Sequence, residues 1–95
     1  MTASHFGVHW SDRLTRVRVR FSKEVAPYIR ERIWHESQQI SDAADGGLLL
    51  ELTVSHLFDL KKWLLSWGCQ ARVLEPAELA EQMAEEARAM ARLYA

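Results

Sequence analysis

Three arginines at alternate positions stand out in the stretch "TRVRVRF", which covers Thr15 to Phe21. Because the side chains of a β-strand alternate between two faces, the three arginines share one face and the apolar residues share the other. Arginine binds phosphate and carboxylate groups through two parallel hydrogen bonds. This stripe is therefore a candidate for binding phosphate, for contacting a partner protein, or for pairing with carboxylates of its own sheet. The arginines are Arg16, Arg18 and Arg20.

A second candidate site is the tetrad "WHES", in which Trp34 and His35 follow a predicted helix. An indole and an imidazole at the end of a helix could bind a ligand. They could also pack the end of the helix against a sheet, which is the commoner role of a tryptophan. The sequence leaves both interpretations open.

The other reactive side chains do not form a catalytic or metal-binding pattern. The four histidines lack metal-ligand spacing, and the single cysteine, Cys69, has no second thiol to help it. No serine or cysteine comes with an arranged base. The glycines at 46 and 47 are typical of a hairpin, since no lysine-containing loop leads from them into a helix. We therefore expect no enzyme activity, no metal and no cofactor.

Composition narrows the class of protein. The chain has 95 residues, of which 48% are hydrophobic, as expected of one domain with its own core. A formal net charge of −1 excludes the strong basic field of a free-standing duplex-DNA binder. The lone cysteine favours a reducing cytoplasm, and no run approaches the roughly 20 apolar residues needed to cross a membrane. We expect a cytoplasmic protein without a signal peptide.

Residue patterns predict four strands and three helices. The predicted strands are 15–21, 37–41, 48–54 and 71–75, and the predicted helices run over 24–32, between Ser55 and Gly68, and from Pro76 to about Leu93. Asp45, Gly46 and Gly47 form the clearest turn, where glycine supplies the positive φ that a hairpin needs. The resulting order is strand, helix, strand, strand, helix, strand and a further helix.

Two strand–helix–strand units joined by a hairpin predict an α+β fold, the ferredoxin-like (βαββαβ) sandwich with an additional C-terminal helix. Right-handed crossovers place the first two helices on one sheet face and leave the other face open. The arginine stripe should lie on that open face, joined by Arg72 from the last strand and by Glu51 from the third. Four arginines and one carboxylate fit either an interface or exposed ion pairs.

Several short motifs in order resemble the WCX domain, the C-terminal extension of WYL-domain transcriptional regulators in bacteria. They are "VRVRFSKEVAPYIRERIWHESQQI", "DGG", a leucine-rich strand, "WLLSWG", "VLEP" and a last helix ending in "LYA". The resemblance covers about residues 15–94. Residues 1–14, with "HFGVHW", look like the joint from a preceding WYL domain, so we expect a fragment of a longer regulator rather than a stand-alone copy.

The resemblance implies a ferredoxin-like extension that helps to form a dimer and to shape the response to an effector. Such regulators carry a helix-turn-helix domain and a WYL domain, which in some members senses a nucleic acid. This chain has no recognition helix and no Trp-Tyr-Leu tripeptide, so it would meet operator DNA only through the other domains. Its expected partners are a second copy, those domains and an oligonucleotide effector.

The predicted function is therefore that of a regulatory and dimerisation domain, with Arg16, Arg18, Arg20 and Arg72 facing a partner or an effector. The alternative is a stand-alone ferredoxin-like module that binds a small molecule, with Trp34 and His35 lining its pocket. Neither reading requires a membrane.

Overall fold

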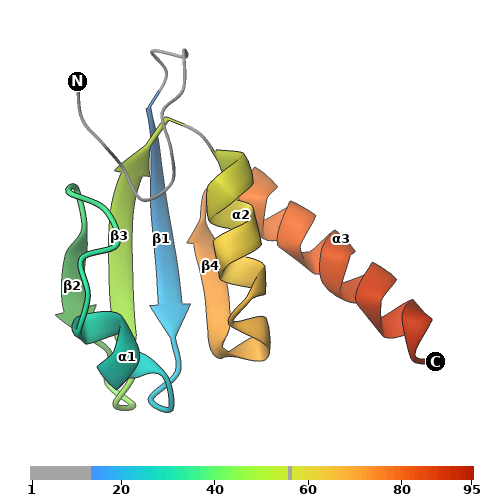
Figure 1. Ribbon diagram of the computed structural model, residues 1–95, viewed down its shortest axis with the longest axis horizontal. Helices are drawn as coiled ribbons and strands as arrows, with labels where there is room; N and C mark the ends of the chain where they lie inside the picture. The colour runs from blue at the N-terminus through green and yellow to red at the C-terminus, as the bar shows by residue number, and fades with distance from the viewer. Residues whose placement is uncertain (1–13, 56) are drawn as a thin grey trace.

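The computed structural model describes residues 14–55 and 57–95 as an α+β structure with a four-stranded antiparallel sheet and a C-terminal helix (Figure 1). Helices α1 and α2 lie over one face of the sheet, and α3 runs outward beside its last strand. The elements are β1 (Thr15–Phe21), α1 (Ala26–Arg30), β2 (Gln39–Asp42), β3 (Leu48–Val54), α2 (Leu57–Leu65), a 3-10 turn (Gly68–Gln70), β4 (Ala71–Glu75) and α3 (Ala77–Leu93). The predicted joint over residues 1–14 lies outside the described residues, except for Leu14.

The strand order is β2-β3-β1-β4, so β1 and β3 lie side by side at the centre. In their register Val17 lies opposite Leu52, and Arg18 lies opposite Glu51. The predicted bounds of β1, β3 and β4 are confirmed, whereas β2 begins two residues later than expected. The apolar residues of β1, which alternate with the arginines, therefore lie on the helix side of the sheet.

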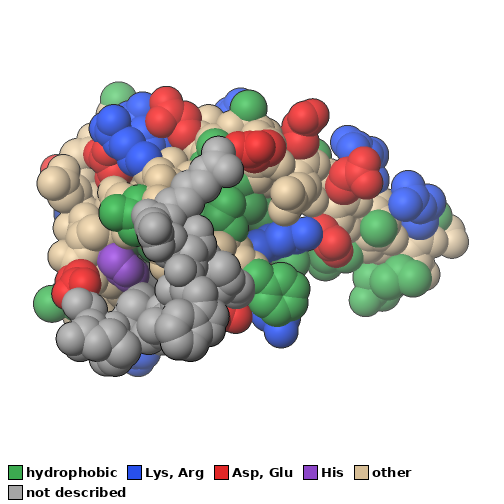
Figure 2. Space-filling view, turned by 90° about the horizontal axis from the view of Figure 1, so that it is seen from above, with side chains coloured by type: hydrophobic (Ala, Val, Ile, Leu, Met, Phe, Trp, Pro, Cys, Tyr) green, Lys and Arg blue, Asp and Glu red, His purple; other side chains and the backbone are tan. Residues whose placement is uncertain are grey.

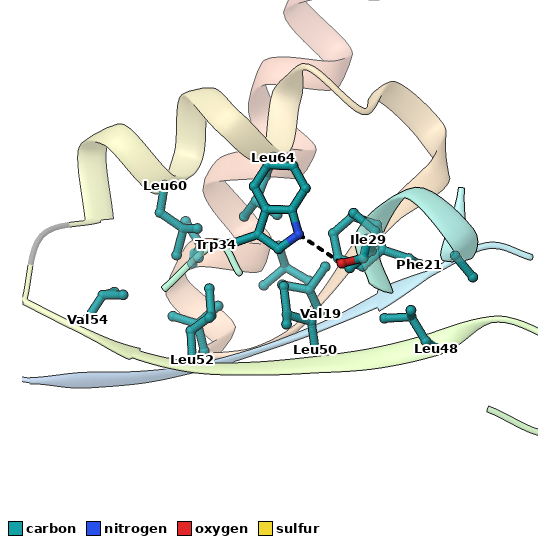
Figure 3. Close-up of a cluster of buried hydrophobic side chains, with 14 residues drawn as sticks. Val19, Phe21, Ile29, Trp34, Leu48, Leu50, Leu52, Val54, Leu60 and Leu64 are labelled. Atoms are coloured by element: carbon teal, nitrogen blue, oxygen red, sulfur yellow. Dashed lines mark hydrogen bonds between the residues drawn. The ribbon is translucent and has the colours of Figure 1, made fainter. Parts of the chain in front are cut away.

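The core lies between the sheet and the two helices that cover it (Figure 3). Alternate residues of β1 and β3 are buried, as a period of two requires when one face is covered. They pack beneath Ile29 of α1 and beneath Leu60 and Leu64 of α2. The buried strand residues are Val17, Val19, Phe21, Leu48, Leu50, Leu52 and Val54.

Helix α1 is shorter than the sequence predicts, because side chains from the following loop donate hydrogen bonds to backbone carbonyls at and after its end. The indole N–H of Trp34 donates to the carbonyl of Ile29 at 3.0 Å, and Gln38 Nε2 donates to the carbonyl of Arg32 at 3.2 Å. At the start, the backbone carbonyl of Ser22, rather than its hydroxyl, accepts a hydrogen bond from Ala26. These tertiary contacts limit α1 to Ala26–Arg30.

The turn between β2 and β3 needs its two glycines for different reasons. Gly46 has a φ of +92°, which favours glycine, as predicted. Gly47 does not have a positive φ, which corrects the prediction for this residue. Its requirement is space, because a Cβ at Gly47 would lie 2.3 Å from the carbonyl oxygen of Phe21.

Helix α3 begins after Pro76, packs against the body through Leu79 and then runs away from the sheet (Figure 1). Within residues 14–55 and 57–95, no helix is both long enough and apolar enough to span a membrane.

Candidate interface on the open sheet face

The four predicted arginines gather on the sheet face opposite the helices. Arg16, Arg18 and Arg20 alternate with buried residues along β1. Arg72 of β4 lies directly opposite Arg20, so two positive side chains occupy neighbouring positions on adjacent strands. Like charges in this arrangement repel one another unless an anion lies between or beside them.

Three of these arginines pair with carboxylates. Arg16 bonds to Glu51, as the strand pattern suggests. Two further ion pairs join Arg18 Nη1 to Glu75 Oε2 at 3.6 Å and Arg20 Nη2 to Asp45 Oδ2 at 2.6 Å. The three arginines of the stripe are therefore all engaged in ion pairs. The prediction that Glu51 is the one carboxylate beside them is wrong, because Glu75 and Asp45 also pair with the stripe.

Sequence reasoning missed the two additional carboxylates for different reasons. Strict alternation along β4 puts Glu75 on the helix side, but an irregularity in the pairing of β1 with β4 skips Leu74 and sets Glu75 opposite Arg18. Asp45 lies in the hairpin turn, where strand periodicity places no side chain. The "DGG" turn was the one signal that could have indicated the position of Asp45. An Asp in such a turn commonly accepts a hydrogen bond from the backbone two residues ahead, which fixes its side chain.

The local hydrogen bonds hold these groups in their charged forms. Gly47 N–H donates to Asp45 Oδ1 at 3.1 Å, and this bond together with the Arg20 guanidinium lowers the pKa of Asp45 below its ordinary value. Hydrogen bonding to Glu51, and the charge of that carboxylate, raise the pKa of Arg16. Arg16 and Arg20 are therefore partly neutralised before any ligand arrives.

Arg72 differs from the other three arginines. Among the ion pairs of residues 14–55 and 57–95 it has no carboxylate partner, and it is exposed. It also lines an apolar hollow between β4 and α3. The positive charge best placed to meet an external anion is therefore at the edge strand of the sheet, not in the middle of the stripe.

Trp34 and His35 lie apart from the arginines. Trp34 is buried on the helix-covered side (Figure 3). Its ring centroid lies 4.8 Å from that of Trp63. His35 Nδ1 lies 2.7 Å from Ser37 Oγ, and that hydroxyl accepts a hydrogen bond from the Thr53 backbone N–H at 2.9 Å. These contacts hold the loop after α1 against the sheet. They agree with the interpretation in which the "WHES" tetrad packs the end of the helix onto the sheet.

Trp34 also borders a surface hollow of about 400 Å³, shared with Tyr28, Arg32 and Trp67. The indole nitrogen of Trp67 is buried and has no hydrogen-bond partner among the residues that the structure describes. His35 is not among the residues that line this hollow. Trp34 therefore borders a hollow, and the ligand role of Trp34 and His35 stays a prediction.

The hollow between β4 and α3 was not anticipated. Its volume is about 530 Å³, and α3 contributes five residues to its wall, which are Ala80, Met83, Ala84, Ala87 and Met90. Their spacing along the helix was the signal that could have revealed it. Cys69 lies exposed on the opposite wall. Across residues 14–55 and 57–95, His, Cys, Asp and Glu form no group of three suited to a metal ion.

The family model described as the WCX domain matches residues 13–91 of the chain. A comparison with curated proteins found no match.

Proposed function

Because the chain belongs to the WCX domain family, which is associated with WYL-type regulators, we propose that it is the C-terminal regulatory and dimerisation domain of a bacterial WYL-type transcriptional regulator. The family match over residues 13–91 is the observation that carries this proposal. The domain acts by binding, without catalysis, in the cytoplasm. Contact with operator DNA belongs to the helix-turn-helix domain of the longer chain.

The strand order supports a ferredoxin-like classification within this proposal. Two strand–helix–strand units joined by a hairpin bring β1 and β3 together at the centre and leave β2 and β4 at the edges. Both crossover helices then cover the same face, which leaves the opposite face available to a neighbouring domain.

The arginine face is the proposed contact surface for the WYL domain and for an effector held between the two domains. Alternate arginines of β1 are ~6.6 Å apart at about 3.3 Å per residue, close to the phosphate spacing of an extended single strand. Ion pairs already occupy Arg16, Arg18 and Arg20, however, so each would have to exchange a carboxylate for a phosphate. This domain therefore assists effector binding and does not provide all of it.

For the domain alone we expect weak, salt-sensitive binding of single-stranded oligonucleotides and no sequence-specific binding of duplex DNA. Neutralising two or three phosphates gives a slope of log K against log salt of about −2 or shallower. No aromatic side chain interrupts the stripe to stack on bases. The measurement is a fluorescence-anisotropy titration of labelled single-stranded and duplex DNA at about 150 mM salt.

Two variants make this titration specific. Arg72→Ala should reduce the residual binding more than Arg18→Ala, because Arg18 already has Glu75 as a partner. Submicromolar affinity that is lost in Arg18→Ala would contradict the prediction and make the stripe an independent nucleic-acid site.

The regulatory role is tested in the source bacterium. A stop codon at Thr15 should change the levels of a limited set of transcripts, and expression of the intact reading frame should restore them. RNA sequencing measures both effects. An unchanged transcript profile would refute the regulator and favour the stand-alone small-molecule module.

A further inference from the structure

The hollow between β4 and α3 has the size of a small-molecule site. Its volume of about 530 Å³ lies within the range of roughly 300–1,000 Å³ that is usual for ligand pockets. Ala71, Ala80 and Met83 line it and also pack against the hydrophobic core, so the fold holds its floor in place. Helix α3 begins directly after β4 and diverges from it (Figure 1). The start of the helix therefore limits the space along β4 at one end, which favours a compact molecule over an added strand.

The two sides of α3 differ in charge. Figure 2 shows acidic and basic side chains along the helix where it projects from the body. Charged residues of α3 line a different hollow together with Lys61, and they are Glu78, Glu81, Glu85, Glu86 and Arg88. The side that faces β4 contributes only alanine and methionine, which are Ala80, Met83, Ala84, Ala87 and Met90. This side therefore fits an apolar body, to which the flexible methionine side chains can adapt.

Arg72 supplies the hollow with a positive charge. It is the only charged residue among those of the described chain that line the hollow. Its guanidinium has no carboxylate partner among the ion pairs of residues 14–55 and 57–95. Arg72 also lies opposite Arg20 on β1, so a bound anion would reduce the repulsion between two neighbouring guanidinium groups. The hollow therefore offers one unpaired cation beside an apolar surface.

The outer edge of β4 adds main-chain donors. Ser22 N–H donates to the carbonyl of Gln70 at 3.0 Å, which sets the alternation of hydrogen bonds between β1 and β4. By that alternation Arg72 directs its backbone groups towards β1, whereas Ala71 and Val73 direct theirs towards the outer edge. Both of the latter residues line the hollow. Their N–H groups can therefore donate to an anion that Arg72 binds.

We propose that this hollow binds a small amphipathic anion, a molecule with one carboxylate or similar acidic group and an apolar body. The acidic group pairs with Arg72 at the edge of the sheet, and the apolar body lies against Met83, Ala87 and Met90 of α3. The inference goes beyond the proposed function, which assigns no ligand to this hollow, and the two can fail separately.

Alkylation of Cys69 measures occupancy of the hollow. Cys69 is exposed, lines the hollow and is the only cysteine of the chain, so its reaction with iodoacetamide reports on this site alone. The rate is followed by intact-protein mass spectrometry at increasing concentrations of octanoate, which is the probe for the anion. Octanoate should slow the reaction in a saturable way, with a half-maximal effect at roughly 0.1–1 mM.

Matched ligands test the two parts of the proposed recognition. Acetate has the carboxylate without the apolar body and should not protect Cys69. Hexanoate should bind roughly tenfold more weakly than octanoate, because two fewer methylene groups are buried. Octylammonium has the same chain with the opposite charge, so it should bind at least about tenfold more weakly.

Two pairs of variants locate the site. Arg72→Gln should weaken octanoate binding about tenfold, because the hydrogen bond to a charged group is lost. Arg92→Gln should leave it unchanged, since Arg92 is also exposed but does not line the hollow. Ala87→Phe should weaken binding by filling the hollow, whereas Ala77→Phe, at an exposed position of α3 outside the hollow, should not. Circular dichroism verifies that all four variants are folded.

Three results would overturn the inference. They are no protection of Cys69 by octanoate, equal protection by octylammonium or acetate, and protection that Arg72→Gln leaves unchanged. The last would mean that the apolar walls bind the chain without recognising the anion. None of these results bears on the regulatory role, which the transcript measurement tests.

Discussion

Replacing Leu52 with alanine is expected to lower the free energy of unfolding by about 2–5 kcal/mol. Leu52 is 0% exposed and lies at the centre of the sheet, opposite Val17 on β1. Rigid strands lie on both sides of β3, so the structure cannot collapse into the space left by the lost side chain. Small domains have a net stability of only about 5–15 kcal/mol, so this loss unfolds a measurable fraction of the protein.

Leu49→Ala on the same strand is the matched control. Leu49 faces the open side of the sheet and is only partly buried, so the same chemical change should cost less than half as much. Urea denaturation followed by tryptophan fluorescence measures both losses. Equal losses at the two positions would contradict the assignment of β3 faces to core and solvent.

Gly47→Ala is the second substitution with a large expected effect. The added Cβ would lie 2.3 Å from the carbonyl oxygen of Phe21, a backbone atom of a central strand. To relieve this overlap, either β1 or the hairpin must move, and overpacking that displaces backbone typically costs about 1–3 kcal/mol and occasionally more. The thermal unfolding midpoint should fall clearly.

Gly68→Ala provides the comparison for this second prediction. Gly68 has a φ of +61°, but a Cβ there would meet nothing within 4 Å. The cost is then mainly that of a left-handed backbone, about 1 kcal/mol. A Gly47→Ala protein as stable as Gly68→Ala would show that the hairpin adjusts freely.

The central part of the fold could be predicted from the sequence because period-two patterns are explicit in β1 and β3. Those patterns gave the buried residues and placed the arginines on the opposite face. The partners of the arginines could not be predicted in the same way. Glu75 depends on an irregular pairing between strands, and Asp45 depends on the path of a turn, and neither follows from alternation.

The end of α1 and the role of Trp34 show a second limit. Helix propensity and spacing gave a helix to about Arg32, but the indole of Trp34 bonds to the carbonyl of Ile29 and the chain turns away. Such a contact joins residues whose proximity appears only after the core has formed. For the hollow beside α3, the spacing of the apolar residues along that helix indicates an apolar wall, but the opposite wall from β4 follows only from the tertiary arrangement.

The clustering of tryptophans has a spectroscopic consequence. Trp34, Trp63 and Trp67 lie with Phe21 in one group of ring contacts on the helix side of the sheet, with centroid distances of 4.8–6.3 Å. Near-ultraviolet circular dichroism depends on such fixed aromatic packing and is lost when the packing loosens. The near-ultraviolet spectrum therefore reports on the core between α1, α2 and β1, while events on the arginine face or along α3 need an external label.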